Sequence, residues 1–245
     1  MSADLWPEIR RHARTLLDIA LPAMCPTCGE RLRLTDQGLC DSCWERIREV
    51  SAPLCPQCGA GDWIAGRKCK GCLKTDIFYG RARQAVQWEE PLISAVHRLK
   101  YNGVAELAEP LARLLARTLR RDHPDWSADL IVPVPLHRVR ERERGYNQAA
   151  LIARQLGRML AWPTDAHAVQ RHRWTPSQTH LTRAERLKNV FGAFRCPQPD
   201  LVAGRRVLLV DDVYTTGSTI NETARALREA EATEVFALTV TRASS

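Results

Sequence analysis

The stretch V-L-L-V-D-D-V-Y-T-T-G-S-T at residues 207–219 decides the fold of this 245-residue chain. Its first four residues are apolar and predict a strand buried on both faces, as in parallel sheets. Asp211 and Asp212 follow this strand directly, and open α/β sheets bind ligands at the carboxyl ends of their strands. A loop around Gly217 then leads into a helix expected over 218–231, whose first N–H groups would form an anion site. Carboxylates beside an anion site suit a sugar phosphate.

The segments on either side of this stretch predict further strands and helices in alternation. Strands are expected over 82–88, 130–134, 166–171 and 235–241, and helices over 91–101, 104–121 and 147–160. A long polar and basic loop is expected in the rest of 163–200. Alternation of this kind is typical of a mostly parallel sheet flanked by helices. The sequence therefore predicts an α/β domain over residues 80–245.

Residues 1–79 are expected to form a separate module, because they are rich in Cys, Gly and Pro and could not bury a core unaided. A helix is predicted at 5–20. After it, eight of the nine cysteines fall into four C-x-x-C pairs with spacers of eleven, eleven and ten residues, which suit zinc ribbons. The repeated C-P-x-C-G at 25–29 and 55–59 indicates a duplicated ribbon.

We expect two structural zinc ions, since four thiolates leave no open coordination position for catalysis. The predicted ligands, taken in sequential order, are Cys25, Cys28, Cys40, Cys43, Cys55, Cys58, Cys69 and Cys72. A cross-braced pairing and thiol redox chemistry are the alternatives. Cys196 stands apart from the pairs and is interpreted as a packed or surface thiol.

The net charge of +8 is carried by one segment of the chain. Residues 137–195 hold twelve Lys and Arg residues against four acids. A local basic field of this kind favours an anionic partner, either a phosphorylated substrate or a nucleic acid; a solvated basic surface is the alternative. No apolar run approaches the ~20 residues needed to span a bilayer. Charged residues interrupt any signal-peptide core near the N-terminus, so we expect a cytoplasmic protein.

Residues 207–219 closely resemble the phosphoribosyl pyrophosphate (PRPP) signature of type I phosphoribosyltransferases. The resemblance implies that the ribose hydroxyls contact Asp211 and Asp212, with Mg²⁺ on the diphosphate. It also implies that the 5′-phosphate is wrapped by Thr215, Thr216, Gly217, Ser218 and Thr219.

Four further motifs extend the resemblance over about residues 21–242. They are L-K-Y-N-G (99–103), V-P-V-P-L-H-R (132–138), R-x-R-G-Y-N-Q (142–148) and a long basic stretch over 174–194. Together with the double ribbon they resemble the ComF family, which comprises competence-associated phosphoribosyltransferase-like proteins of bacteria. The resemblance implies a type I phosphoribosyltransferase fold and a role in uptake or use of external DNA, with a helicase-like partner.

Two loops acquire roles from this comparison. Leu136, His137 and Arg138 occupy the position of the pyrophosphate loop. Residues 171–194 occupy the position of a flexible loop that closes over the reaction, where Arg183 and Lys188, with the acidic pair, are the predicted catalytic residues. Cations there would neutralise the departing pyrophosphate.

Three functions follow as hypotheses. The first is Mg²⁺-dependent phosphoribosyl transfer to an acceptor that is left open, because no base pocket is recognisable. The second is a non-catalytic adaptor for single-stranded DNA, in which bases stack on aromatic rings beside arginines. Its predicted contacts are Arg142, Arg144, Tyr146, Arg171, Arg173 and Trp174. The third is a sensor that binds PRPP without turning it over.

Overall fold

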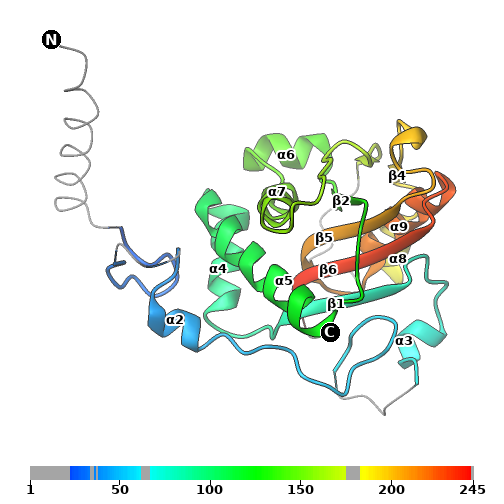
Figure 1. Ribbon diagram of the computed structural model, residues 1–245. Helices are drawn as coiled ribbons and strands as arrows, with labels where there is room; N and C mark the ends of the chain where they lie inside the picture. The colour runs from blue at the N-terminus through cyan, green and yellow to red at the C-terminus, as the bar shows by residue number, and fades with distance from the viewer. Residues whose placement is uncertain (1–22, 34–35, 37, 62–66, 175–182, 244–245) are drawn as a thin grey trace, which may run out of the picture.

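A four-stranded parallel sheet forms the centre of the computed structural model, which describes residues 23–33, 36, 38–61, 67–174 and 183–243 (Figure 1). Its strands run in the order β1 (Arg81–Val86), β6 (Glu234–Arg242), β5 (Arg206–Tyr214) and β2 (Leu130–Pro133). The register pairs Val210 of β5 with Pro133 of β2 and with Leu238 of β6. The predicted parallel sheet is confirmed.

Each face of the sheet carries its own apolar core because side chains alternate along a strand. Leu208 and Val210 of β5 face the core shared with α4 (Leu92–Tyr101), α5 (Ala108–Asp122) and α7 (Gln148–Leu160). Val207 and Leu209 face the other core, where α9 (Ser218–Glu229) packs. A short 3₁₀ helix, η1 (Ala105–Leu107), precedes α5, and a second, η2 (Pro199–Leu201), precedes β5.

β5 is longer than the four apolar residues that predicted it. It continues through the two aspartates to Tyr214 because β6 pairs with it along the whole length, Val213 opposite Thr241. The strand expected at 166–171 is wrong in extent. Only β3 (Gln170–Arg171) forms, antiparallel to β4 (Phe194–Arg195).

Within the described part of residues 80–245, two α-helices form where the sequence predicted none. α6 (Arg138–Arg144) buries none of its residues, so it has no apolar periodicity to reveal it. Its ends carry the signals instead: the His137 side chain accepts a hydrogen bond from the N–H of Val139, and Gly145 has a φ of 85° at the C-cap. The second is α8 (Arg183–Val190), which lies in the expected long loop.

The two ribbons pack on opposite faces of the domain. The first ribbon, residues 25–43, ends with α2 (Asp41–Glu45) and places Leu39, Cys40 and Cys43 in the core of α4 and α5. The second ribbon, residues 55–72, ends with α3 (Lys70–Leu73) and joins the core of α9. Between them, residues 48–50 run antiparallel along β1, with the N–H of Val50 donating to Ala85. The helix expected at 5–20 lies outside the described residues.

Candidate functional site

The carboxyl ends of β5 and β2 bring two predicted loops together. The N–H of Val134 donates to the carbonyl of Val210 over 2.9 Å, so that the chain leaving β2 starts beside Asp211. Asn147, the N-cap of α7, accepts from the N–H groups of Ala149 and Ala150 and donates to the Val134 carbonyl. The pyrophosphate-loop residues 136–138 are thereby held at the same sheet edge as the acidic pair.

The acidic pair has an unequal environment. Asp212 is buried, only 3% exposed, and its Oδ2 lies 2.8 Å from Nζ of Lys100, while Asp211 is half-buried. Desolvation raises the pKa of Asp211 well above its ordinary value, and the neighbouring Asp212 charge raises it further. Burial lowers the pKa of Lys100, but the two carboxylates outweigh burial and hold that pKa above its usual range.

The predicted phosphate loop leads into α9 at Ser218, where the sequence places the start of a helix. Gly217 has a φ of 79°, and the hydroxyls of Thr216 and Ser218 are hydrogen-bonded over 2.7 Å. α9 begins at Ser218, and the side chains of Thr215 and Thr219 are half-buried beside it. The free N–H groups at the start of this twelve-residue helix therefore lie next to several small hydroxyl side chains. Such an arrangement favours the binding of an anion.

The pyrophosphate loop contributes one titratable group and one exposed cation. Leu136 and His137 are half-buried, and Arg138 is exposed. His137 bridges to Arg171 as a parallel pair, which joins this loop to the start of the predicted closing loop. Burial lowers the pKa of His137, and the nearby cations of Arg171 and Arg138 lower it further. The lowered pKa favours the neutral imidazole, whose Nδ1 accepts the hydrogen bond from the N–H of Val139.

Each ribbon gathers its four thiols into one cluster, in sequential order as expected. In the first ribbon Sγ of Cys25 lies 3.8 Å from Sγ of Cys43. In the second, Sγ of Cys55 lies 4.0 Å from Sγ of Cys72, and Sγ of Cys58 lies 3.6 Å from Sγ of Cys69. Tetrahedral Zn–S bonds of about 2.3 Å place sulfurs about 3.8 Å apart. Both clusters therefore fit zinc.

Known proteins resemble the chain along most of its length. A family model for the double zinc ribbon domain matches residues 16–73, and one for the phosphoribosyl transferase domain matches residues 103–245. Competence protein F of Haemophilus influenzae is 34% identical over 228 residues, which are 91% of this chain and 92% of that protein. The chain belongs to the ComF family.

One further relative and one solved structure are similar to parts of the chain. DNA utilization protein YhgH of Escherichia coli K12 is 38% identical over 65% of this chain and 70% of its own. Glutamine PRPP amidotransferase of Bacillus subtilis covers 59% of this chain, with a TM-score of 0.40, 18% identity and 30% of its own chain covered. The two family models show that the chain joins a type I phosphoribosyltransferase fold to a zinc-ribbon module. Within its described residues no helix is long and apolar enough to cross a bilayer.

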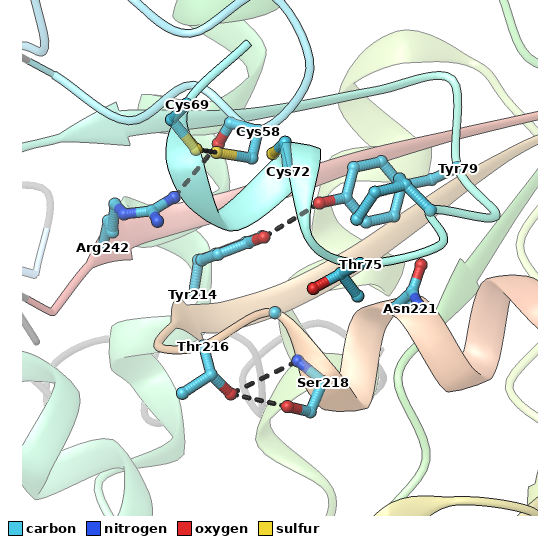
Figure 2. Close-up of a pocket in the computed structure, with 12 residues that line it drawn as sticks. Cys58, Cys69, Cys72, Thr75, Tyr79, Tyr214, Thr216, Ser218, Asn221 and Arg242 are labelled. Carbon is cyan, nitrogen blue, oxygen red and sulfur yellow. Dashed lines mark hydrogen bonds between the residues drawn. The ribbon is translucent and has the colours of Figure 1, made fainter. Parts of the chain in front are cut away.

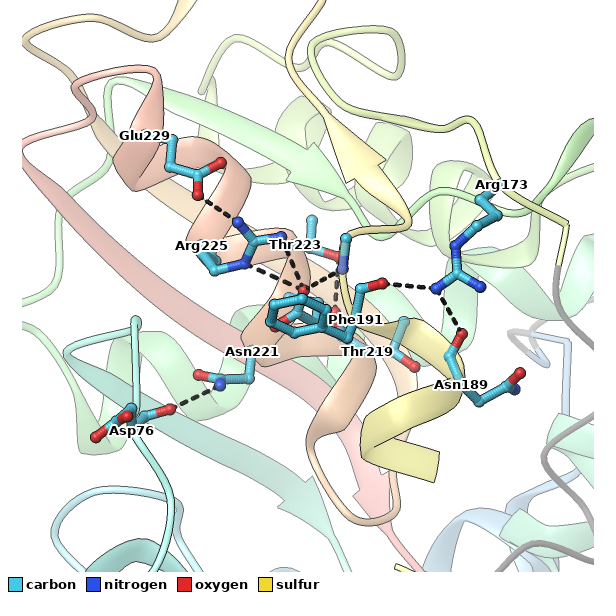
Figure 3. Close-up of polar contacts among 11 residues, drawn as sticks. Asp76, Arg173, Asn189, Phe191, Thr219, Asn221, Thr223, Arg225 and Glu229 are labelled. Atoms are coloured by element: carbon cyan, nitrogen blue, oxygen red, sulfur yellow. Dashed lines mark hydrogen bonds and ion pairs between the residues drawn. The ribbon is translucent and has the colours of Figure 1, made fainter. Parts of the chain in front are cut away.

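The predicted closing loop of this ComF chain is fastened at its base. Arg173 donates to the carbonyls of Asn189 and Phe191, over 3.1 and 2.6 Å (Figure 3). Arg225 of α9 lies over the Phe191 ring and pairs with Glu222, which accepts from the N–H of Gly192. The end of α8 is therefore tied to the helix that follows the phosphate loop. Lys188 is exposed on α8, and the side chain of Arg183 lies outside the description.

The residues predicted to contact nucleic acid differ in their surroundings. Arg142 is exposed, and Trp174 is 52% exposed. Tyr146 is half-buried and donates its hydroxyl to the Leu99 carbonyl over 2.5 Å. Arg144 lies over the Tyr101 ring and Arg171 over the Phe194 ring, while Arg173 donates to the carbonyls of Asn189 and Phe191. The structure does not test their role in nucleic-acid binding, which stays a prediction.

Several residues of the site were not predicted from the sequence. Lys100 was visible only as part of the L-K-Y-N-G motif, and its partner is 112 positions away. Tyr214 lies beyond the strand predicted at 207–210, yet it ends β5, is 3% exposed and packs against Gly217. A buried tyrosine inside a polar signature was the signal that could have revealed it.

Proposed function

We propose that this protein binds PRPP with Mg²⁺ and transfers its phosphoribosyl group to an acceptor, in a process tied to the use of external DNA. The observation that carries the proposal is the shared sheet edge: the acidic pair lies near the carboxyl end of β5, residues 215–219 follow that end, and residues 136–138 follow the carboxyl end of the adjacent strand β2. A molecule with a 5′-phosphate, two ribose hydroxyls and a diphosphate meets all three features.

The chemistry assigns each feature one task. The carboxylates of Asp211 and Asp212 would hold the 2′- and 3′-hydroxyls, while residues 215–219 would hold the 5′-phosphate. The bond between C1′ and the pyrophosphate oxygen breaks, the acceptor's lone pair forms the new bond to C1′, and the acceptor's proton passes to solvent. Mg²⁺ would neutralise the diphosphate, which supplies most of its ligands. Arg183 and Lys188 would add positive charge as the pyrophosphate leaves.

Titration of the zinc-loaded protein with PRPP and Mg²⁺ tests this proposal, with pyrophosphate release followed in the same sample. Asp212→Asn should lose binding. Asp200→Asn is the matched control, because Asp200 is exposed in η2 before β5 begins. Binding with release supports the transferase. Binding without release supports a sensor or adaptor, and no binding overturns the assignment of residues 207–219.

The adaptor for single-stranded DNA is the second candidate, and exposed aromatic side chains favour it. Trp174 and Phe191, 52% and 67% exposed, lie at the two ends of the predicted closing loop. Stacking on such rings is tolerant of base sequence. Affinity should then fall steeply with salt as phosphates lose their cations. A salt-independent affinity, or none, contradicts the adaptor. A helicase-like competence partner stays a prediction from the family resemblance.

A further inference from the structure

The second ribbon packs directly against the phosphate loop. One cavity is lined from both sides, by Cys58 and Cys72 of the ribbon and by Tyr214, Gly217 and Ser218 of the loop (Figure 2). Predicted zinc ligands and phosphate-loop residues therefore line the same cavity, although some 140 residues of sequence or more separate them.

Two tyrosines form the first link between ribbon and loop. The hydroxyls of Tyr79 and Tyr214 are hydrogen-bonded over 2.8 Å, and both residues are almost fully buried. Tyr214 in turn determines the path of the loop. A Cβ placed on Gly217 would lie 2.1 Å from the Tyr214 hydroxyl, so the backbone passes as close to that ring as a glycine permits. The position of the Tyr214 ring thus fixes the left-handed turn that opens α9.

Asn221 forms the second link, between the start of α9 and the chain leaving the ribbon. Its side-chain N–H donates to the Asp76 carbonyl over 2.8 Å (Figure 3). Its Oδ1 accepts from the N–H of Phe78 over 2.9 Å. Asn221 is only 5% exposed. Losing these partners would leave a buried amide unpaired, at a cost of about 1–3 kcal/mol.

The carbonyl of Cys58 forms the third link. It accepts from Nε2 of Gln84 over 3.0 Å and from Nη1 of Arg242 over 3.1 Å. The same Arg242 guanidinium lies 4.4 Å from the centroid of the Tyr214 ring. A residue that bears a zinc ligand is thereby joined, through one arginine, to the residue that supports the phosphate loop.

The first ribbon offers an internal comparison. It has the same C-P-x-C-G knuckle, but it packs on the opposite face of the sheet, where Gly38 lies against Pro110 of α5. Zinc at the two ribbons should therefore affect the phosphate loop differently.

We infer that zinc in the second ribbon positions the phosphate loop, so that metal at Cys55, Cys58, Cys69 and Cys72 and the phosphorylated ligand at 211–219 stabilise each other. The inference rests on the proposed function. In small metal sites the free energy of metal binding stabilises the folded state. Zinc bound in the second ribbon would therefore order the chain that leaves it, including Tyr79 and residues 76–78. Coupling between two sites is reciprocal by thermodynamic necessity. The ligand must then retain the metal as strongly as the metal retains the ligand.

Zinc transfer to a chromogenic chelator, 4-(2-pyridylazo)resorcinol, tests this inference on the full chain. Cys28→Ser and Cys58→Ser each remove one predicted ligand, at matched positions of the two knuckles. Each variant therefore identifies the phase of zinc release that belongs to its own ribbon. Saturating PRPP with Mg²⁺ should slow release from the second ribbon about tenfold, within the usual range of coupling between sites, and leave release from the first ribbon unchanged. Equal slowing of both phases, or none despite PRPP binding, overturns the inference. Absence of PRPP binding to the unaltered chain defeats the proposed function, and the inference with it.

Tyr79→Phe provides a second test in which all eight cysteines are retained. It keeps the ring but leaves the Tyr214 hydroxyl buried and without the Tyr79 oxygen. PRPP affinity should fall about fivefold while the zinc content stays at two per chain, and the ligand's effect on zinc release should shrink, as the typical coupling range implies. Unchanged affinity together with unchanged ligand protection of the second zinc would overturn the role of this link.

Discussion

Nζ of Lys100, at the C-terminal end of α4, lies 2.8 Å from Oδ2 of Asp212, at the carboxyl end of β5. This ion pair fixes the helix against the strand end that carries both acids. It also supplies a positive charge next to Asp211, which opposes the rise in the pKa of that carboxyl. A ribose bound at this edge would meet an acidic pair that already has one counter-ion. Four predictions follow from this and neighbouring features.

Lys100→Met should destabilise the protein by about 3 kcal/mol, because removal of one partner leaves a buried charge uncompensated. Urea unfolding of the zinc-loaded protein measures the change. The double variant Lys100→Met with Asp212→Asn should recover most of the loss. Lys74→Met, at an exposed position, is the control. A loss in the single variant no larger than in this control would contradict the structural importance of the pair.

Asp211→Asn should stabilise the protein at neutral pH while PRPP binding is lost. The pKa of Asp211 is raised in the folded state, so ionisation of this carboxyl lowers the free energy of unfolding. This loss of stability is fully present above the folded-state pKa and absent below the ordinary carboxyl pKa. The gain in stability of the variant over the parent should therefore be greatest near pH 8 and should decrease as the pH falls. Thermal unfolding from about pH 8 to 5.5 measures this trend. Asp200→Asn should show no such pH dependence, and a variant less stable than the parent at pH 8 would refute the expectation.

Gly217→Ala should cost more than the same change at Gly204. Both glycines have positive φ, 79° and 72°, and an alanine in the left-handed region costs about 1–2 kcal/mol. A Cβ at Gly217 also meets the Tyr214 hydroxyl at 2.1 Å, whereas nothing lies within 4 Å of one at Gly204. Urea unfolding should show a larger loss of stability for Gly217→Ala than for Gly204→Ala. PRPP calorimetry should show that only Gly217→Ala loses binding. Equal effects at both positions would contradict the close packing.

Gly59→Ala should weaken zinc retention more than Gly29→Ala, although the two occupy matched positions in the duplicated knuckle. A Cβ at Gly59 would lie 2.8 Å from Oε1 of Gln84 and 2.9 Å from the Ala82 carbonyl, while one at Gly29 meets nothing within 4 Å. We expect zinc release from the second ribbon to accelerate about tenfold, the effect of about 1.4 kcal/mol. Chelator competition measures both phases, and equal acceleration in the two variants would count against this packing.

Local patterns predicted the sheet, the helices α4, α5, α7 and α9 that pack on it, and the cysteine sets. The apolar run at 207–210 and the C-x-x-C spacing are such patterns, since each is complete within a few residues. α6 escaped prediction because all its residues stay outside the core, so no 3.6-residue apolar period exists. The partners of Lys100 and Tyr214 escaped for another reason: each contact joins residues more than 100 positions apart, and only the folded chain brings them together.

The run of chain between the ribbons has a consequence for solubility. Exposed edge strands present unpaired N–H and C=O groups that can template pairing with another molecule. Here residues 48–50 pair with residues 85–87 at the end of β1, and the Gln57 carbonyl accepts from the N–H of Ala82 near its start. On the opposite margin, residues 163–165 pair with Ile131 of β2. Both margins of the sheet are thus protected against edge-to-edge aggregation, one of them by the segment that the two zinc ribbons hold between them.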